Sequence, residues 1–195
     1  MDDPLVFGRV LLRKGIHLLW GLLALGFISL GNFLADTLFI LWLTGMVAAD
    51  ALRFYVPFWH RLFLRLFAPL LKPSEKKAFP TGATVLVAAF ATVQLFFPQK
   101  IAIASILVLT LADAFAALVG IFWPVGKWGR NKTLSGSFAF FLVASAVLIR
   151  YFNFSIVEVI STGTVVTLLE AYAPPRWENW WIAVGCSSLL RFMVT

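Results

Sequence analysis

Long apolar runs separated by short polar segments dominate the sequence. A helix that crosses a bilayer core needs roughly 17 to 25 mostly apolar residues, and about seven segments meet that requirement approximately. The pattern therefore predicts an all-α, polytopic integral membrane helical bundle with about seven transmembrane helices, forming a single membrane-embedded domain over residues 1–195. The predicted spans cover residues 16–33, 35–55, 80–97, 101–121, 136–150, 154–172 and 179–194.

The segment FWHRLFLRLFAPLLK, between Pro57 and Pro73, has a different pattern. Arg61 and Arg65 are four residues apart among phenylalanine, tryptophan and leucine, so they share one face of a helix. A helix with apolar and basic faces is typical of the headgroup layer. We therefore expect an amphipathic interfacial helix between the second and third spans.

Composition and the placement of charge agree with a membrane protein. Hydrophobic residues make up 61% of the chain and charged residues 13%, which excludes an ordinary soluble domain. The cations flank the apolar runs rather than forming one hydrophilic patch, which argues against nucleic-acid binding. If the seven spans alternate, Lys100, Arg150 and Arg191 fall on one side and the other thirteen of the sixteen lysines and arginines on the opposite side. Because cations favour cytoplasmic loops, we expect a multi-pass protein of the cell membrane with a cytoplasmic N-terminus.

Three acidic residues lie near the cytoplasmic ends of predicted spans. Asp113 stands inside the apolar run LVLTLADAFAALVG, where a carboxylate is costly unless it has a partner or a function. Glu170 lies near the end of the sixth span, and Glu178 with Asn179 lies just before the seventh. Asp113, Glu170 and Glu178 together predict a Mg²⁺ site, since this ion prefers oxygen ligands shared with phosphates. Helix capping is the alternative interpretation for Glu178 and Asn179.

The loop VGKWGRNKTLSG combines glycines and cations before a predicted helix start. Glycine allows backbone amides to approach phosphate oxygens, and cations and a helix N-terminus neutralise their charge. It is not a P-loop, because Asn131 stands where the second glycine belongs. The loop predicts a phosphate-binding segment, with a purely topological basic loop as the alternative. Its candidate residues are Gly126, Lys127, Gly129, Arg130, Lys132, Thr133 and Gly136.

Further polar residues lie in the first two spans. Arg13 and His17 share a helix face in RKGIH, with Lys14 at its edge, at the cytoplasmic mouth of the first span. They indicate a contribution to the same site, with membrane anchoring and a structural histidine as the alternatives. Asp50 and Arg53 are three residues apart and predict an ion pair that neutralises both charges.

Three ordered segments, at 13–17, 112–141 and 168–179, resemble the CTP-dependent lipid kinases, the family of dolichol kinase, phytol kinase and the yeast-type diacylglycerol kinase. These kinases are related to the phosphatidate cytidylyltransferases. The family pattern reads approximately R-K-x-x-H, then G-D-x-x-A-x-x-x-G, then K-[ST]-x-E-G, then an acidic residue and a D-N pair. The matching positions are Arg13, Lys14, His17, Asp113, Ala116, Gly120, Lys132, Thr133, Gly136, Glu170 and Asn179.

This chain departs from the family pattern at three positions. Ala112 replaces the glycine before the aspartate, Ser135 replaces a glutamate, and Glu178 replaces the aspartate before Asn179. The change at Glu178 keeps a carboxylate, whereas the change at Ser135 removes one. The departure at Ser135 therefore bears on the metal-ligand set or on the identity of the phosphate acceptor.

The resemblance implies transfer of the γ-phosphoryl group of CTP to a membrane lipid alcohol: a polyprenol or dolichol, a phytol-like isoprenoid alcohol or a diacylglycerol. It implies Mg²⁺ on Asp113, with Glu170 and Glu178 as further metal or nucleotide contacts, and either Asp113 or His17 as acceptor of the hydroxyl proton. Lys132 is the expected catalytic cation. The residues implied at the nucleotide and its phosphates are Arg13, Lys14, Gly120, Gly126, Lys127, Gly129, Arg130, Lys132, Thr133, Gly136 and Asn179.

Two other functions use similar residues. A phosphatidate cytidylyltransferase would join CMP to a lipid phosphate, and Arg13 and Lys14 suit its anionic acceptor equally well. A small transporter would also bury Asp113 and Glu170, but it does not predict polar motifs gathered on one membrane face. The sequence leaves the lipid acceptor and the oligomeric state open.

Overall fold

The computed structural model describes residues 4–72, 75–76, 79–130 and 132–194. Pro73, Lys77 (one of the thirteen cations) and Asn131 lie outside the described residues. The elements are α1 (Pro4–Ser29), α2 (Asn32–Tyr55), α3 (Pro57–Phe67), α4 (Gly82–Phe96), α5 (Gln99–Leu107), the π-helix η2 (Val108–Ala112), α6 (Asp113–Phe122), β1 (Lys127–Trp128), β2 (Lys132–Thr133), α7 (Leu134–Tyr151), α8 (Ile156–Tyr172) and α9 (Glu178–Val194).

The all-α membrane fold predicted from the sequence is confirmed. Within the described residues, four helical segments are long and apolar enough to cross a membrane: Phe7–Ser29, Asn32–Tyr55, Gln99–Phe122 and Leu134–Tyr151. Gly82–Phe96 is a shorter apolar helix. Helices also cover the last two predicted spans, as α8 and α9, but the count of seven crossings stays a prediction.

Local sequence signals explain where the helices begin and end. The Thr81 and Thr133 side chains accept hydrogen bonds from backbone amides in the first turns of α4 and α7. Ser155 and Glu158 form a capping box at the start of α8. The first helix begins at Pro4 rather than near residue 16 and ends before Gly31, whose φ of 95° is a left-handed conformation that glycine adopts readily.

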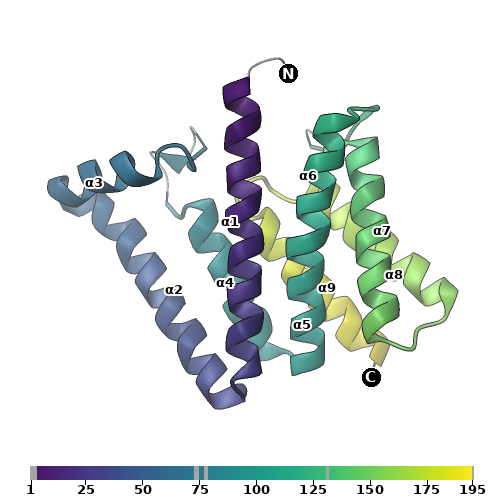
Figure 1. Ribbon diagram of the computed structural model, residues 1–195. Helices are drawn as coiled ribbons and strands as arrows, with labels where there is room; N and C mark the ends of the chain where they lie inside the picture. The colour runs from purple at the N-terminus through teal and green to yellow at the C-terminus, as the bar shows by residue number, and fades with distance from the viewer. Residues whose placement is uncertain (1–3, 73–74, 77–78, 131, 195) are drawn as a thin grey trace.

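The helices place several predicted cytoplasmic segments at one end of the molecule. Figure 1 shows the start of α1, the short helix α3 and the connection between α6 and α7 at the same end, with the C-terminus at the other. Helix α3 lies across the end of α2, so the predicted amphipathic segment is a helix, and its location in the headgroup layer stays a prediction. This common end is where the candidate site lies.

The core is made by α4, α5 and the parts of other helices that pack on them. Phe39, Phe90 and Phe140 are fully buried, among alanines that let the helices approach closely. Large apolar side chains such as Leu22 and Phe33 are exposed on α1 and α2. Outward-facing apolar side chains are expected where lipid, not water, is the solvent.

A buried ion pair fixes the end of α2. Arg53 Nε lies 2.7 Å from Asp50 Oδ1, as the spacing predicted, and both residues are 1% exposed. Asp50 Oδ2 accepts hydrogen bonds from the Thr81 amide (2.6 Å) and the Thr84 hydroxyl (3.0 Å). Arg53 Nη1 donates to the carbonyl of Glu75 at 2.9 Å. The pair therefore joins α2 to the segment before α4 and to the start of α4.

Arg53→Met should destabilise the protein by about 3–5 kcal/mol, because it leaves the buried Asp50 carboxylate without its cation. Thermal unfolding of the detergent-purified protein, followed by size-exclusion chromatography, measures the change. Arg65→Met on exposed α3 is the matched control and should unfold like the wild type. Equal unfolding temperatures for the two variants would contradict the structural role of the pair.

Candidate active site

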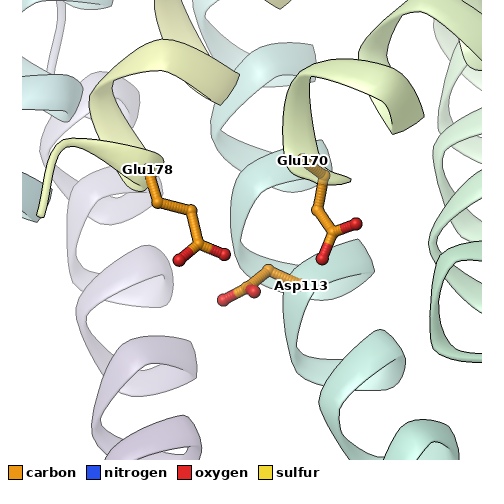
Figure 2. Close-up of side chains that lie close together, drawn as sticks. All are labelled: Asp113, Glu170 and Glu178. Atoms are coloured by element: carbon orange, nitrogen blue, oxygen red, sulfur yellow. The ribbon is translucent and has the colours of Figure 1, made fainter. Parts of the chain in front are cut away.

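Three carboxylates from distant parts of the chain converge. Asp113 begins α6, Glu170 lies near the end of α8 and Glu178 begins α9. One oxygen of each lies within 4.8 Å of the other two, and Figure 2 shows the three side chains pointing toward a common centre. Asp113 and Glu170 are 3% and 2% exposed. The structure therefore brings together the three carboxylates that the sequence predicted as metal ligands, and their binding of Mg²⁺ stays a prediction.

The wide turn of η2 lies directly before Asp113. Thr110 Oγ1 donates to the carbonyl of Ile106 at 2.6 Å within this part of the span. Gly21 of α1 packs against it so closely that a Cβ at that position would lie 2.3 Å from Thr110 Cγ2. Single π turns inside α-helices are frequent at functional sites, and the apolar pattern gave no signal for this one. The close approach of α1 brings its polar residues to Asp113.

Lysines neutralise the carboxylates. Lys14 of α1 forms an ion pair with Asp113 Oδ2. Lys132 of β2 lies 2.6 Å from Glu170 Oε1 and also pairs with Glu178. Two lysine ammonium groups thus contact the three carboxyl groups. The Glu178 side chain therefore faces this cluster, as the metal-site interpretation expected.

The Lys132 side chain stays protonated. Burial of its ammonium group acts to lower the pKa, but attraction to Glu178, then to Glu170 and Asp113, outweighs burial and raises the pKa above the ordinary value for lysine. Lys132 is therefore a cation throughout the physiological pH range. It is the only predicted phosphate-binding residue of the loop that pairs with the carboxylates, among the described residues.

His17 lies beside Asp113, one turn along α1 from the lysine. Its Nε2 is 3.8 Å from Asp113 Oδ2 and 3.2 Å from the carbonyl oxygen of Leu109. Lys14 and His17 of the predicted RKGIH motif therefore contact the start of α6 and the turn before it. Arg13 is half-buried on the same helix.

The loop between α6 and α7 forms a short hairpin. Strands β1 and β2 are antiparallel, with Lys127 opposite Thr133. Gly129 has a φ of 57°, and a Cβ there would lie 2.5 Å from the carbonyl oxygen of Ala171. The amide of Arg130 donates to that same oxygen at 2.8 Å. The hairpin is thus bound to the end of α8, beside Glu170.

Other loop glycines and hydroxyls also have structural contacts. A Cβ at Gly120 would lie 2.7 Å from Thr133 Oγ1, and one at Gly136 would lie 2.8 Å from the Ala116 carbonyl oxygen. These glycines allow α6 and α7 to approach closely. Thr133 Oγ1 also accepts from the Gly136 amide at 3.1 Å.

The remaining predicted nucleotide residues surround the carboxylates less closely. Gly126, with a φ of 61°, and the side chains of Lys127 and Arg130 are exposed on the hairpin. Asn179 is half-buried on α9 beside Glu178. Their roles in nucleotide binding stay predictions.

Ser135 stands where the family pattern has a glutamate. Among the described residues its side chain makes no hydrogen bond to Asp113, Glu170 or Glu178. Its hydroxyl donates to the carbonyl of Trp123, in the loop after α6. It also lies 3.3 Å from Thr133 Oγ1. The Ser135 side chain therefore belongs to the hydrogen bonds that shape the start of α7.

Trp128, Ser137 and Lys72 lie near the site but were not predicted from the sequence. The Ser137 hydroxyl donates to Glu170 Oε2 at 3.2 Å, and Trp128 Nε1 donates to Ser137 Oγ at 2.9 Å. Burial, followed by repulsion from Arg13, lowers the pKa of Lys72 and indicates that Lys72 lies near the cations of α1. A serine in an apolar helix and a lysine in a basic loop are too common to predict these positions.

The chain is similar to two curated proteins. It is 31% identical over 135 residues to the CTP-dependent diacylglycerol kinase 1 of Schizosaccharomyces pombe, covering 67% of this chain and 61% of that protein. It is 30% identical over 117 residues to an uncharacterized protein of Rickettsia prowazekii, covering 56% of each. The chain thus spans about three fifths of the length of these curated relatives. No protein-family model matches the chain. No solved structure matches it.

The similarity to the yeast protein supports the family that the sequence motifs suggested. That relative is named a CTP-dependent diacylglycerol kinase, and the match covers two thirds of this chain. The comparison therefore supports placing the chain among the CTP-dependent lipid kinases, while dolichol and phytol kinases are not distinguished by it.

Gly129→Ala should destabilise the docked hairpin by about 1–2 kcal/mol from the left-handed backbone alone, with a further cost from the contact with Ala171. Faster proteolytic cleavage near residue 130 measures the loss. Gly8→Ala is the matched control, because no atom lies within 4 Å of a Cβ at that position of α1. Unchanged cleavage in Gly129→Ala would refute the close packing of hairpin and helix.

Proposed function

We propose that this protein transfers the γ-phosphoryl group of CTP to the hydroxyl of a membrane lipid alcohol at the cytoplasmic face. The observation that carries the proposal is the convergence of Asp113, Glu170 and Glu178 with Lys14 and Lys132 at one end of a membrane bundle. The similarity to a CTP-dependent diacylglycerol kinase supports the choice of CTP and makes diacylglycerol the first acceptor to test.

The carboxylates suit Mg²⁺. This ion takes oxygen ligands at about 2.0–2.1 Å in octahedral geometry, which places neighbouring ligands about 3 Å apart and opposite ones about 4 Å apart. Carboxylate oxygens within 4.8 Å of one another need only small adjustments to approach that arrangement. Asp113, Glu170 and Glu178 would hold the ion, which when bound neutralises charge on the phosphates.

The cations of the site suit a triphosphate. Phosphoryl transfer depends mainly on positioning and on stabilising charge spread over the phosphate oxygens. In the proposed complex, Lys132 and Lys14 exchange part of their interaction with the carboxylates for contacts to phosphate. Lys127 and Arg130, exposed on the adjoining hairpin, add further positive charge. The hairpin glycines keep backbone amides within reach of the same phosphates.

Proton acceptance falls to Asp113 or His17. The two side chains lie 3.8 Å apart, between Nε2 and Oδ2, so the alcohol oxygen can approach both. Asp113 also pairs with Lys14 and is needed for the metal. Both acceptor assignments therefore place the reacting hydroxyl at the junction of α1 and α6.

The direct test is the mass of the lipid product. Purified protein is given CTP, Mg²⁺ and a mixture of diacylglycerol, polyprenol, phytol and phosphatidate, and we expect one alcohol to gain a single phosphate. Asp113→Asn should lower turnover at least about 100-fold, as expected when a group central to charge stabilisation is lost. Asp36→Asn is the matched control, since Asp36 Oδ1 accepts a hydrogen bond from Gln94 and lies away from the carboxylate cluster.

Other products would contradict the proposal. Gain of CMP by phosphatidate would assign the chain to the cytidylyltransferases instead. No product from any lipid, with a folded protein, would reject both enzymatic functions. Full turnover by Asp113→Asn would remove Asp113 from the active site.

Orientation in the membrane has its own test. The cysteine of the Lys127→Cys variant should react with a membrane-impermeant maleimide only after the cells are opened, because the hairpin is expected to be cytoplasmic. Asn153→Cys, exposed between α7 and α8, is the paired position and should react in intact cells. The native Cys186 is fully buried and should stay unlabelled. The reverse labelling pattern would place the site outside.

A further inference from the structure

A groove of about 580 Å³ lies between α7, α8 and the hairpin. Its volume falls in the range of about 300–1,000 Å³ that is typical of small-molecule sites. Half of its ten lining residues are aliphatic side chains or phenylalanines: Val125, Leu134, Phe138, Phe141 and Leu168. The groove is open, and Leu134 and Phe138 are 53% and 61% exposed. It therefore offers an apolar surface on a helix that is long enough to cross a membrane.

One side of the groove is linked to the carboxylates by hydrogen bonds. Trp128 and Ser137 both line it. Trp128 donates to Ser137, and Ser137 donates to Glu170 Oε2 at 3.2 Å. Ser137 is only 4% exposed, so its hydroxyl is held at the inner side of the groove. A substrate hydroxyl beside Ser137 would be separated from Glu170 only by the Ser137 side chain.

A second groove lacks this connection. It has a volume of about 480 Å³ and is lined by Ala51, Phe54, Tyr55 and Phe79. None of these four side chains contacts Asp113, Glu170 or Glu178 among the hydrogen bonds and ion pairs of the described residues. The groove at Ser137, by contrast, combines an apolar surface with a hydrogen-bonded connection to Glu170.

We propose that the groove between α7 and α8 binds the lipid alcohol. The hydrocarbon next to the hydroxyl lies along Phe138, Phe141 and Leu168, and the hydroxyl extends past Ser137 and Glu170 toward Asp113. The proposal rests on the proposed lipid kinase function and adds the place where the acceptor lies. It explains how a substrate dissolved in the bilayer reaches buried carboxylates without crossing water. Ser137 acts as a positioning residue, since it contacts Glu170 from the groove side, and Trp128 acts through its hydrogen bond to Ser137.

The first experiment measures binding without turnover. The full-length protein in phosphatidylcholine nanodiscs is exposed to a diacylglycerol that carries a diazirine on the acyl chain near the glycerol, in the absence of CTP. After illumination, mass spectrometry locates the attached lipid. We expect labelling concentrated on α7 and α8 around the groove and reduced by an excess of unlabelled diacylglycerol. Labelling spread evenly over α1, α2 and α4, without competition, would identify bulk lipid only and overturn the proposal.

The second experiment fills the groove. Thr164 lines it and is exposed, so Thr164→Trp adds bulk without disturbing the core. We expect about a tenfold higher KM for the lipid alcohol, an unchanged KM for CTP and weaker photolabelling. Val165→Trp, on the neighbouring exposed position outside the groove, should leave all three quantities unchanged. Equal behaviour of the two variants would overturn the proposal.

The two proposals fail in different ways. Competed labelling of the groove with no phosphorylated product would support the binding site and reject the kinase function. A phosphorylated product with unspecific labelling would support the kinase and reject the groove.

Discussion

The site depends on the neutralisation of buried acidic groups by lysines. Asp113 and Glu170 are almost fully buried, and a third carboxylate, Glu178, lies beside them. Isolated charges in such a place would cost several kcal/mol each. Lys14 and Lys132 come from opposite parts of the chain to offset that cost, so the cluster also holds α1 and the hairpin against α6, α8 and α9. The contacts that stabilise the fold and those that gather charged side chains at the candidate site are thus the same contacts.

The close packing of backbones makes these charge contacts possible. Gly21 lets α1 reach η2, and Gly120 and Gly136 let α6 and α7 approach each other. Gly129 lets the hairpin meet the end of α8. Long lysine side chains then reach carboxylates on neighbouring elements. Small residues that would be unremarkable in a membrane helix therefore determine which polar side chains meet.

The sequence predicted the helical fold because apolar runs of the right length admit few alternatives in a bilayer. It predicted the Asp113, Glu170 and Glu178 cluster because carboxylates near the membrane interior are costly and therefore informative. It also predicted the Asp50–Arg53 pair from their helical spacing. It did not predict η2, the contact of Ser137 with Glu170 or the pairing of Lys132 with carboxylates. The Ser137 and Lys132 contacts join segments far apart in the chain, and η2 is a local change of helical geometry, so the apolar periodicity carries no signal for any of them.

The π turn at η2 sets the rotational register of the third long apolar segment. In a regular α-helix each residue turns the chain by roughly 100°, so one extra residue within a turn shifts everything after it by about that angle. Residues before η2 can keep their buried face toward α4 and α9, while Asp113 is directed to the side where α1, α8 and α9 meet. One continuous span can therefore serve two differently oriented surfaces, a core in its first half and a polar cluster in its second.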